Sequence, residues 1–250
     1  MSGHSKWSTI KRKKGKTDAA RGKAFTKVVR EIAAAVKSGG GGDPSGNPRL
    51  RMAIDKAKEI NMPNDNIERA IKKASGGGEG TILDEVVYEG YGPNGVAMMV
   101  EAITDNKQRT VSEIRNAFSK HGGNLGETGC VSWMFKKKGL ISFEKGKVDE
   151  EKLMSSAIEA GAEDIKTEES MVVVETLPEK MEGVRDSLKA EFEVASSEVS
   201  MVPQNTVHME AEDAHKILKL IGALEESDDV QNVHANFDIP DEIMNQEASD

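Results

Sequence analysis

The side chains best suited to chemistry in this sequence are the bases of its first 30 residues. Ten lysines and arginines stand there against one acid, Asp18. Dense positive charge on a flexible segment follows phosphate groups and releases their counterions. Trp7 could stack on an exposed base, or it could instead pin the segment to the rest of the fold. The predicted nucleic-acid-binding residues are Lys6, Trp7, Lys11, Arg12, Lys13, Lys14, Lys16, Arg21, Lys23, Lys27 and Arg30.

The rest of the chain has the opposite charge. Residues 1–75 hold 18 bases and 7 acids, whereas the remaining 175 residues hold 16 bases and 36 acids. A solubilising basic face is the simpler interpretation, but such a cluster in a chain of net charge −9 favours polyanion binding. Phosphate contacts position a protein on nucleic acid without reading its sequence. The charge therefore predicts the class of ligand and leaves the target sequence open.

A search for catalytic patterns returns little. Lys14-Gly15-Lys16-Thr17 ends like a phosphate-binding loop, but that motif needs a glycine where Ile10 stands. Cys130 lies in an apolar stretch, with no neighbour that would lower its pKa, so we interpret it as a small core residue. The five histidines do not have metal-ligand spacing. We therefore predict a protein that is not an enzyme and has no cofactor.

One weak metal-binding pattern stands at the N-terminus. If Met1 is removed, Ser2, Gly3 and His4 bring an amine, two amide nitrogens and an imidazole within reach of one ion. That donor set suits square-planar Cu(II) or Ni(II). We favour the simpler interpretation, in which His4 is another polar group of the basic segment, because metal choice in cells follows availability rather than affinity.

The composition predicts a cytoplasmic protein without a membrane partner. The chain has 250 residues, of which 37% are hydrophobic and only 4% aromatic, so its cores must be aliphatic. Its single cysteine excludes an internal disulfide and fits a reducing compartment. No apolar run approaches the ~20 residues of a membrane span, and the N-terminus has no apolar signal core.

Hydrophobic spacing divides the first 79 residues into a basic arm and a helical bundle. Residues 1–16 have no apolar period and read as an arm. Three amphipathic helices follow, starting near Thr17, Pro48 and Pro63, with glycine runs after the first and the third. In the third helix, Arg69, Lys72 and Lys73 fall on the outward face, so the second and third helices are expected to support the basic surface.

After residue 80 the pattern changes to α+β. Strands are predicted at 86–91, 96–100 and 130–135, with a helix between the second and third. Residues 139–204 show the order βαββαβ of a ferredoxin-like domain. Residues 205–240 are expected to fold back and complete the domain begun at 80–138, which makes 139–204 an insertion. The last segment, 241–250, is an acidic tail. The predicted fold class is therefore multidomain α+β.

Short motifs of glycine, asparagine and charged residues are spread over almost the whole chain. From about residue 2 to Glu242, these motifs resemble those of the YebC/PmpR family and follow one another in the same order. So many motifs in one order make a chance similarity very improbable. The motifs are Gly3-His4-Ser5-Lys6-Trp7, Arg21-Gly22-Lys23, Gly41-Gly42-Asp43-Pro44, Asn47-Pro48-Arg49-Leu50-Arg51, Asn61-Met62-Pro63, Tyr88-Glu89-Gly90-Tyr91-Gly92-Pro93, Thr104-Asp105-Asn106, Arg109-Thr110-Val111, Gly122-Gly123-Asn124-Leu125-Gly126 and Asp229-Val230-Gln231-Asn232-Val233.

The resemblance implies a fold and a class of function. The fold is an N-terminal helical domain followed by two α+β domains, and the function is non-enzymatic, cytoplasmic regulation. Bacterial members are described as DNA-binding transcriptional regulators. Other members, including the mitochondrial translational activator of cytochrome oxidase subunit I, act on the ribosome, and bacterial relatives are linked to relief of stalling at proline-rich stretches.

Two functional hypotheses follow and stay open at this point. In the first, the protein binds promoter DNA and regulates transcription. In the second, it binds ribosomal RNA near the peptidyl-transferase region, and a basic arm that orders on binding suits RNA at least as well as DNA. In both, the acidic domains shape the footprint or contact a partner, which could be the ribosome or a regulatory protein. An enzyme, the third class, would need a cleft with clustered titratable groups.

Overall fold

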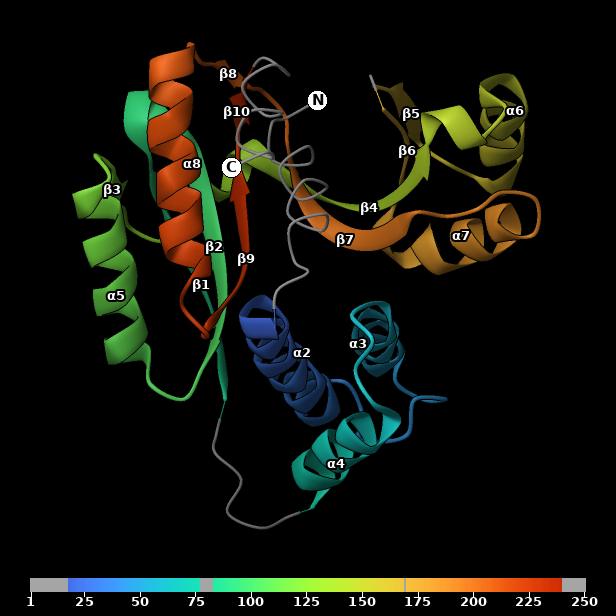
Figure 1. Ribbon diagram of the computed structural model, residues 1–250, viewed down its shortest axis with the longest axis horizontal. Coiled ribbons are helices and arrows are strands. Elements are labelled where there is room, and N and C mark those ends of the chain that lie inside the picture. Colours follow the sequence, from blue (N-terminus) through green and yellow to red (C-terminus); the bar gives the residue numbers. More distant parts are fainter. Residues whose placement is uncertain (1–17, 77–82, 169, 240–250) are drawn as a thin grey trace.

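The computed structural model describes residues 18–76, 83–168 and 170–239. Figure 1 shows three parts: a helical part at the N-terminal end of the chain, a sheet flanked by two helices, and a second sheet backed by two more helices. The predicted fold class, multidomain α+β with an N-terminal helical domain, is confirmed. The predicted arm at 1–16 and the acidic tail at 241–250 lie outside the described residues.

The helical domain is built from three amphipathic helices. They are α2 (Asp18–Ser38), α3 (Pro48–Glu59) and α4 (Asn64–Ser75). Their apolar faces meet in one cluster, because aliphatic residues recur at helical spacing in each of them. The buried members are Val28, Ile32, Ala35, Val36, Leu50, Ala53, Ala57, Met62, Ile67 and Ala70.

A single buried amide joins the end of α2 to the start of α3. The side-chain oxygen of Asn47 accepts the backbone N–H of Leu50 at 3.0 Å, which caps α3. Its amide nitrogen donates to the carbonyl oxygens of Ala35 and Gly41, each at 2.9 Å. Pro48 then occupies the first helical turn, where no backbone donor is needed. The Asn-Pro pair therefore sets the angle between two of the three helices.

The first sheet has the strand order β3-β1-β2-β9. Helices α5 and α8 cover the same face of it (Figure 1), and their apolar residues form one core with β2 and β9. Strand β9 comes from the C-terminal part of the chain and pairs antiparallel with β2. The elements are β1 (Asp84–Tyr91), β2 (Ala97–Thr104), α5 (Lys107–Lys120), β3 (Asn124–Leu125), α8 (Ala211–Glu225) and β9 (Val230–Ala235). Two short strands, β8 (Val207–His208) and β10 (Phe237–Asp238), pair in parallel as a separate sheet. In the chain, β8 precedes α8 and β10 follows β9.

The second sheet has the antiparallel order β5-β6-β4-β7 and the connectivity βαββαβ. This is the ferredoxin-like arrangement that the spacing of strands and helices predicts. Its core lies between the sheet and the two helices that follow β4 and β6. The elements are β4 (Phe135–Glu144), α6 (Glu150–Ala160), β5 (Asp164–Thr167), β6 (Met171–Thr176), α7 (Met181–Lys189) and β7 (Ser196–Pro203).

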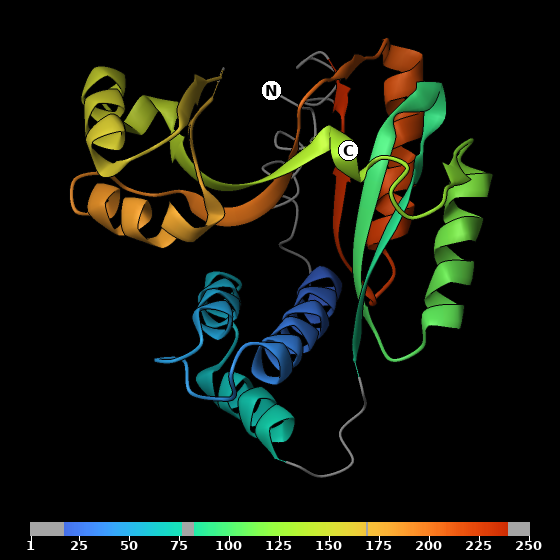
Figure 2. The same ribbon diagram turned by 180° about the vertical axis from the view of Figure 1, so that it is seen from behind.

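Strands β4 and β7 form the connection between the two α+β domains. Figure 2 shows them as a long, curved pair that runs from the first sheet to α6 and α7. The pairing extends from Phe135 opposite Pro203 to Ser142 opposite Ser196. Because β4 runs without a break past Lys138, the predicted domain limits at 138 and 139 stay a prediction.

The strand predicted at 130–135 is wrong. The structure has a 3-10 helix, η2 (Ser132–Met134), and β4 begins only at Phe135. The reason is the buried carboxylate of Glu89, which accepts the backbone N–H groups of Gly129, Val131 and Ser132, each at 2.8 Å. Amides that donate to a side chain are not available for a strand ladder, so the apolar run folds as a tight turn.

Gly139 is a position where the second sheet and its helices approach too closely for a side chain. A Cβ placed there would lie 2.6 Å from Cβ of Met181 and would also overlap Oγ1 of Thr176. We expect Gly139→Ala to lower the free energy of unfolding by about 1–3 kcal/mol, because the buried neighbours must shift. Urea denaturation measures this. Gly183→Ala, which meets no atom within 4 Å, is the control, and equal effects of the two substitutions would contradict the account.

Candidate nucleic-acid interface

The predicted binding residues fall into three groups in the structure. Lys6, Trp7, Lys11, Arg12, Lys13, Lys14 and Lys16 lie outside the described residues, as do Ser2, Gly3 and His4 of the weak metal pattern. Arg21 and Lys23 are exposed near the start of α2. Lys27 and Arg30, one and two turns further on, are only half exposed.

Lys27 and Arg30 contact the first sheet domain. The ammonium of Lys27 donates to the carbonyl oxygen of Glu225 at 2.8 Å, at the end of α8. The guanidinium of Arg30 donates to the carbonyl oxygen of Ile103 at 3.0 Å and to the carboxylate of Asp229. These two bases therefore hold α2 against the sheet. A role in nucleic-acid binding stays a prediction for both, beside this structural role.

Asp229 is the centre of that domain contact. It is 2% exposed, and its carboxylate accepts from Arg109 at 2.6 Å, from Thr110 at 2.7 Å and from Thr104 at 3.1 Å, besides Arg30. Burial alone would raise its pKa, but the hydrogen bonds from Arg109, Thr110 and Arg30 outweigh burial and lower it. The carboxylate is thus ionised and joins α2, β2 and α5 at one point.

Two further bases of the helical domain are neutralised by carboxylates. Arg49 forms a two-pronged pair with Glu85 at the start of β1, with one N–O distance of 2.8 Å. Lys56 pairs with Glu31 inside the domain at 2.7 Å. Because a paired base offers less charge to a phosphate, the basic surface is smaller than the sequence count indicates.

Five bases of the helical domain have no carboxylate partner in the part of the chain that the structure describes, and three of them lie on α4. Lys58, Arg69, Lys72 and Lys73 are exposed, and none of them forms an ion pair with any residue that the structure describes. Lys23 on α2 shares both properties. We call these five residues the open basic set. Only Lys23 is among the predicted binding residues; the other four are visible in the sequence as outward positions of amphipathic helices.

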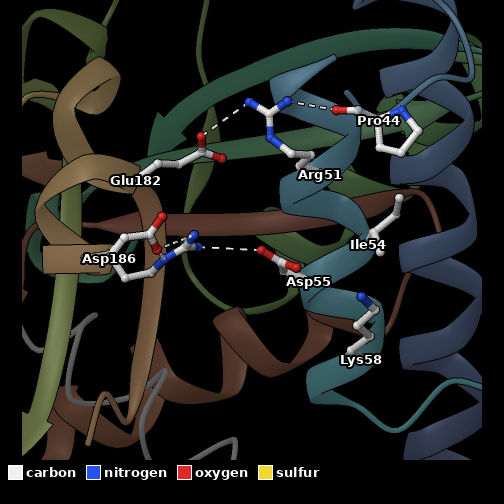
Figure 3. Close-up of a pocket in the computed structure, with 8 residues that line it drawn as sticks. Pro44, Arg51, Ile54, Asp55, Lys58, Glu182 and Asp186 are labelled. Carbon is white, nitrogen blue, oxygen red and sulfur yellow. Dashed lines mark hydrogen bonds and ion pairs between the residues drawn. The ribbon is translucent and has the colours of Figure 1, made fainter. Parts of the chain in front are cut away.

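A cleft separates the helical domain from the ferredoxin-like domain. It has a volume of about 330 Å³ and lies between α3 and α7. Figure 3 shows Arg51 reaching from α3 toward Glu182, at 3.5 Å, while it also donates to the carbonyl oxygen of Pro44 at 2.7 Å. Arg185 of α7 reaches back to Asp55 at 3.5 Å. Since bases and acids pair across it, the cleft behaves as an ionic contact between domains.

A second polar contact joins the two sheets. His234 of β9 is buried, with Nδ1 3.4 Å from the hydroxyl of Ser200 on β7 and Nε2 3.5 Å from the carboxylate of Glu101 on β2. Asn232 donates to the same carboxylate at 2.8 Å. Serine, histidine and glutamate are the residue types of a hydrolase triad, but Ser200 is itself buried and is not presented to a substrate. The cluster instead fixes β7 against β9.

Glu101 gives this contact a pH dependence. Burial raises the pKa of Glu101, but the hydrogen bond and charge of His234 and the amide of Asn232 lower it to about 2. A carboxyl whose pKa is lowered by folding stabilises the fold above its ordinary pKa, and this contribution is lost as pH falls toward the folded value. We expect Glu101→Gln to be less stable than wild type at neutral pH, with the difference shrinking between about pH 4.5 and about pH 2. Urea denaturation across that range measures it, and a constant difference would contradict the assignment.

Two family descriptions match the chain in sequence order. Residues 5–77 match the TACO1/YebC protein N-terminal domain, and residues 83–237 match the TACO1/YebC second and third domain. The chain belongs to the TACO1/YebC family. The resemblance predicted from the sequence motifs is confirmed, and the family's division into an N-terminal domain and two further domains agrees with the helical part and the two sheets.

Relatives of this TACO1/YebC chain match it over nearly its full length. A protein of Geotalea uraniireducens is 59% identical over 245 residues, and one of Syntrophus aciditrophicus is 59% identical over 246; both alignments cover 98% of each chain. Both are named "Probable transcriptional regulatory protein". The crystal structure of a conserved hypothetical protein from Aquifex aeolicus has a TM-score of 0.81 and 51% identity, covering 89% of this chain and 92% of the other.

Within 18–76, 83–168 and 170–239, no three His, Cys, Asp or Glu side chains are grouped so that they could hold a metal ion. None of the helices described there is long and apolar enough to cross a membrane.

Proposed function

We propose that this chain is a non-catalytic, cytoplasmic regulator that binds DNA through its N-terminal domain and controls transcription. The open basic set carries the proposal. In a chain of net charge −9, five exposed bases of one small domain form no ion pair with any carboxylate in the described residues. The basic arm predicted at residues 1–16 adds to the same end of the chain. The names of the relatives support a regulatory role.

The charge distribution also indicates how the two sheet domains contribute to DNA binding. Bases on α2 and α3 are bonded to carboxylates and carbonyls of the two sheet domains, which leaves the exposed bases of α4 for the ligand, with Lys58 at the edge of the cleft between α3 and α7. The acidic domains repel phosphate, so they restrict the protein to one orientation on a duplex. They are also the surfaces we propose for a regulatory protein partner.

A pair of binding assays tests the proposal. Wild-type protein is titrated into a duplex from its own upstream region at several salt concentrations, and in parallel is sedimented with ribosomes in moderate salt. We expect a salt-dependent shift of the duplex, because binding through phosphate contacts releases counterions. Sedimentation with ribosomes and no shift of any duplex would overturn the transcriptional proposal in favour of the ribosomal RNA hypothesis.

A further inference from the structure

Two arginines at the start of α3 are bonded to carboxylates of the two sheet domains. Arg49 pairs with Glu85 of β1, with one N–O distance of 2.8 Å, and Arg51 pairs with Glu182 of α7 at 3.5 Å. The first turn of α3 contains no acid of its own. Because the N-terminal end of a helix carries partial positive charge, two arginines there do not stabilise α3. They need anions from elsewhere, and the sheet domains supply them.

The helical domain itself orients both guanidinium groups. Arg49 also donates to the hydroxyl of Ser38 at 2.7 Å, at the end of α2. One nitrogen of Arg51 donates to the carbonyl oxygens of Pro44 at 2.7 Å and Ser45 at 3.1 Å, in the loop before α3. Each guanidinium is therefore held in place without the carboxylate of the other domain. Groups that are already oriented lose little entropy when they bind an anion.

The carboxylates occupy positions that suit the oxygens of a phosphate group. Two nitrogens of Arg49 donate to the two oxygens of Glu85. Arginine binds carboxylate and phosphate in this same two-pronged way, because its planar group of N–H donors matches both. In Arg51, the nitrogen that donates to Glu182 is the one that the loop carbonyls do not use, as Figure 3 shows. Both arginines thus offer donors to an oxyanion from outside their own domain.

These two ion pairs are exposed, unlike the contact at Asp229. The side chains of Arg49 and Glu85 are 40% and 45% exposed. Those of Arg51 and Glu182 are 39% and 32% exposed, whereas that of Asp229 is only 3% exposed. Exposed ion pairs contribute little to stability, and an exposed carboxylate can turn into solvent without leaving a buried charge. A phosphate can therefore replace the two glutamates while the contact at Asp229 keeps the domains together.

We propose that Arg49 and Arg51 are a second set of phosphate-binding residues, which Glu85 and Glu182 cover in the free protein and release when DNA binds. The inference rests on the proposed function, because it adds two bases of α3 to the open basic set once the duplex is present. The two carboxylates compete with phosphate for the same nitrogens. They therefore act as an autoinhibitory contact that weakens DNA binding.

Removing the two competing carboxylates tests the proposal. Glu85→Gln with Glu182→Gln keeps the size of both side chains and removes their charge. We expect this double variant to bind the upstream duplex roughly 2- to 30-fold more tightly than wild type at equal salt, the factor that two exposed ion pairs represent. Arg49→Gln with Arg51→Gln should lower the slope of log K against log salt by about 1.8 units, since each lost phosphate contact lowers it by about 0.9. In the variant with all four changes, the gain from the glutamates should be absent.

The control is Glu163→Gln with Glu191→Gln, which removes two exposed carboxylates that pair with lysines inside the ferredoxin-like domain. It changes the net charge equally and should leave the affinity close to that of wild type. If wild type binds the duplex but the Glu85 and Glu182 variant gains no more than this control, the second set is wrong while the proposed function stands. The same holds if the gain persists without the two arginines. If wild type binds no duplex, the proposed function fails and this inference with it.

Discussion

Replacing Arg69, Lys72 and Lys73 together by glutamine is expected to reduce the salt dependence of duplex DNA binding by about 2.7 units of log K against log salt. Each phosphate contact that is lost lowers this slope by about 0.9. At physiological salt the affinity should fall roughly 100-fold, because the counterion release from three contacts disappears. The three side chains are exposed on α4 and have no carboxylate partners among the described residues.

A control variant with the same change in charge makes this result specific. Lys180, Lys189 and Lys219 are exposed, and they also form no ion pairs with described residues, but they lie on the two sheet domains. Changing all three to glutamine alters the net charge equally and should leave the slope within about one contact, 0.9 units, of wild type. Equal losses in both triple variants would mean that net charge, and not a surface on α4, governs binding.

Asp229→Ala is expected to lower the free energy of unfolding by about 3 kcal/mol. Removing one partner of a buried, hydrogen-bonded charge pair leaves the other groups without compensation, which costs about 3–5 kcal/mol. We expect the lower end of that range, because Arg109 and Arg30 can turn partly toward solvent. Thr104 and Thr110 lose an acceptor as well. The loss should appear in the transition of the helical domain and the first sheet in urea denaturation.

The neighbouring acid provides the control for Asp229. Asp228 carries the same side chain but is exposed. Asp228→Ala should change the free energy of unfolding by less than about 0.5 kcal/mol, as is usual for surface substitutions. Asp229→Asn, which keeps the shape and loses the charge, should fall between the two. If Asp229→Ala and Asp228→Ala were equally stable, Asp229 would not be the centre of the domain contact.

Local patterns were sufficient to predict most elements of this fold. The three N-terminal helices follow from aliphatic residues at helical spacing, and Asn47-Pro48 marks the start of α3 through a cap that the structure contains. The order βαββαβ follows from alternating strand and helix patterns and corresponds to the second sheet. These features depend on residues close together in the chain, so the sequence displays them directly.

Features that depend on distant residues could not be predicted in this way. Lys27 and Arg30 occupy positions on α2 that look solvent-exposed, and only the fold brings Glu225 and Asp229 next to them, some 200 residues later. The segment 130–135 has the composition of a strand, and only the carboxylate of Glu89 explains why it turns instead.

The candidate site differs from its prediction for the same reason. Charge density along the sequence predicts a binding surface at residues 6–30, and the structure describes only the part of this segment from Asp18 onward, in which the predicted binding residues are Arg21, Lys23, Lys27 and Arg30. The bases of α4 are less dense in sequence, yet they have no carboxylate partner among the described residues, whereas the fold pairs Arg49, Arg51 and Lys56. Which bases stay available to a ligand is therefore a property of tertiary structure.

Lysine footprinting tests most directly whether the N-terminal domain is the nucleic-acid surface. The protein is acetylated with and without saturating duplex, and the reactivity of each lysine is measured by mass spectrometry. We predict that DNA protects Lys23, Lys58, Lys72 and Lys73, whereas Lys180, Lys189 and Lys219 react as in the free protein. Protection of the second set, with the first set unchanged, would contradict the account.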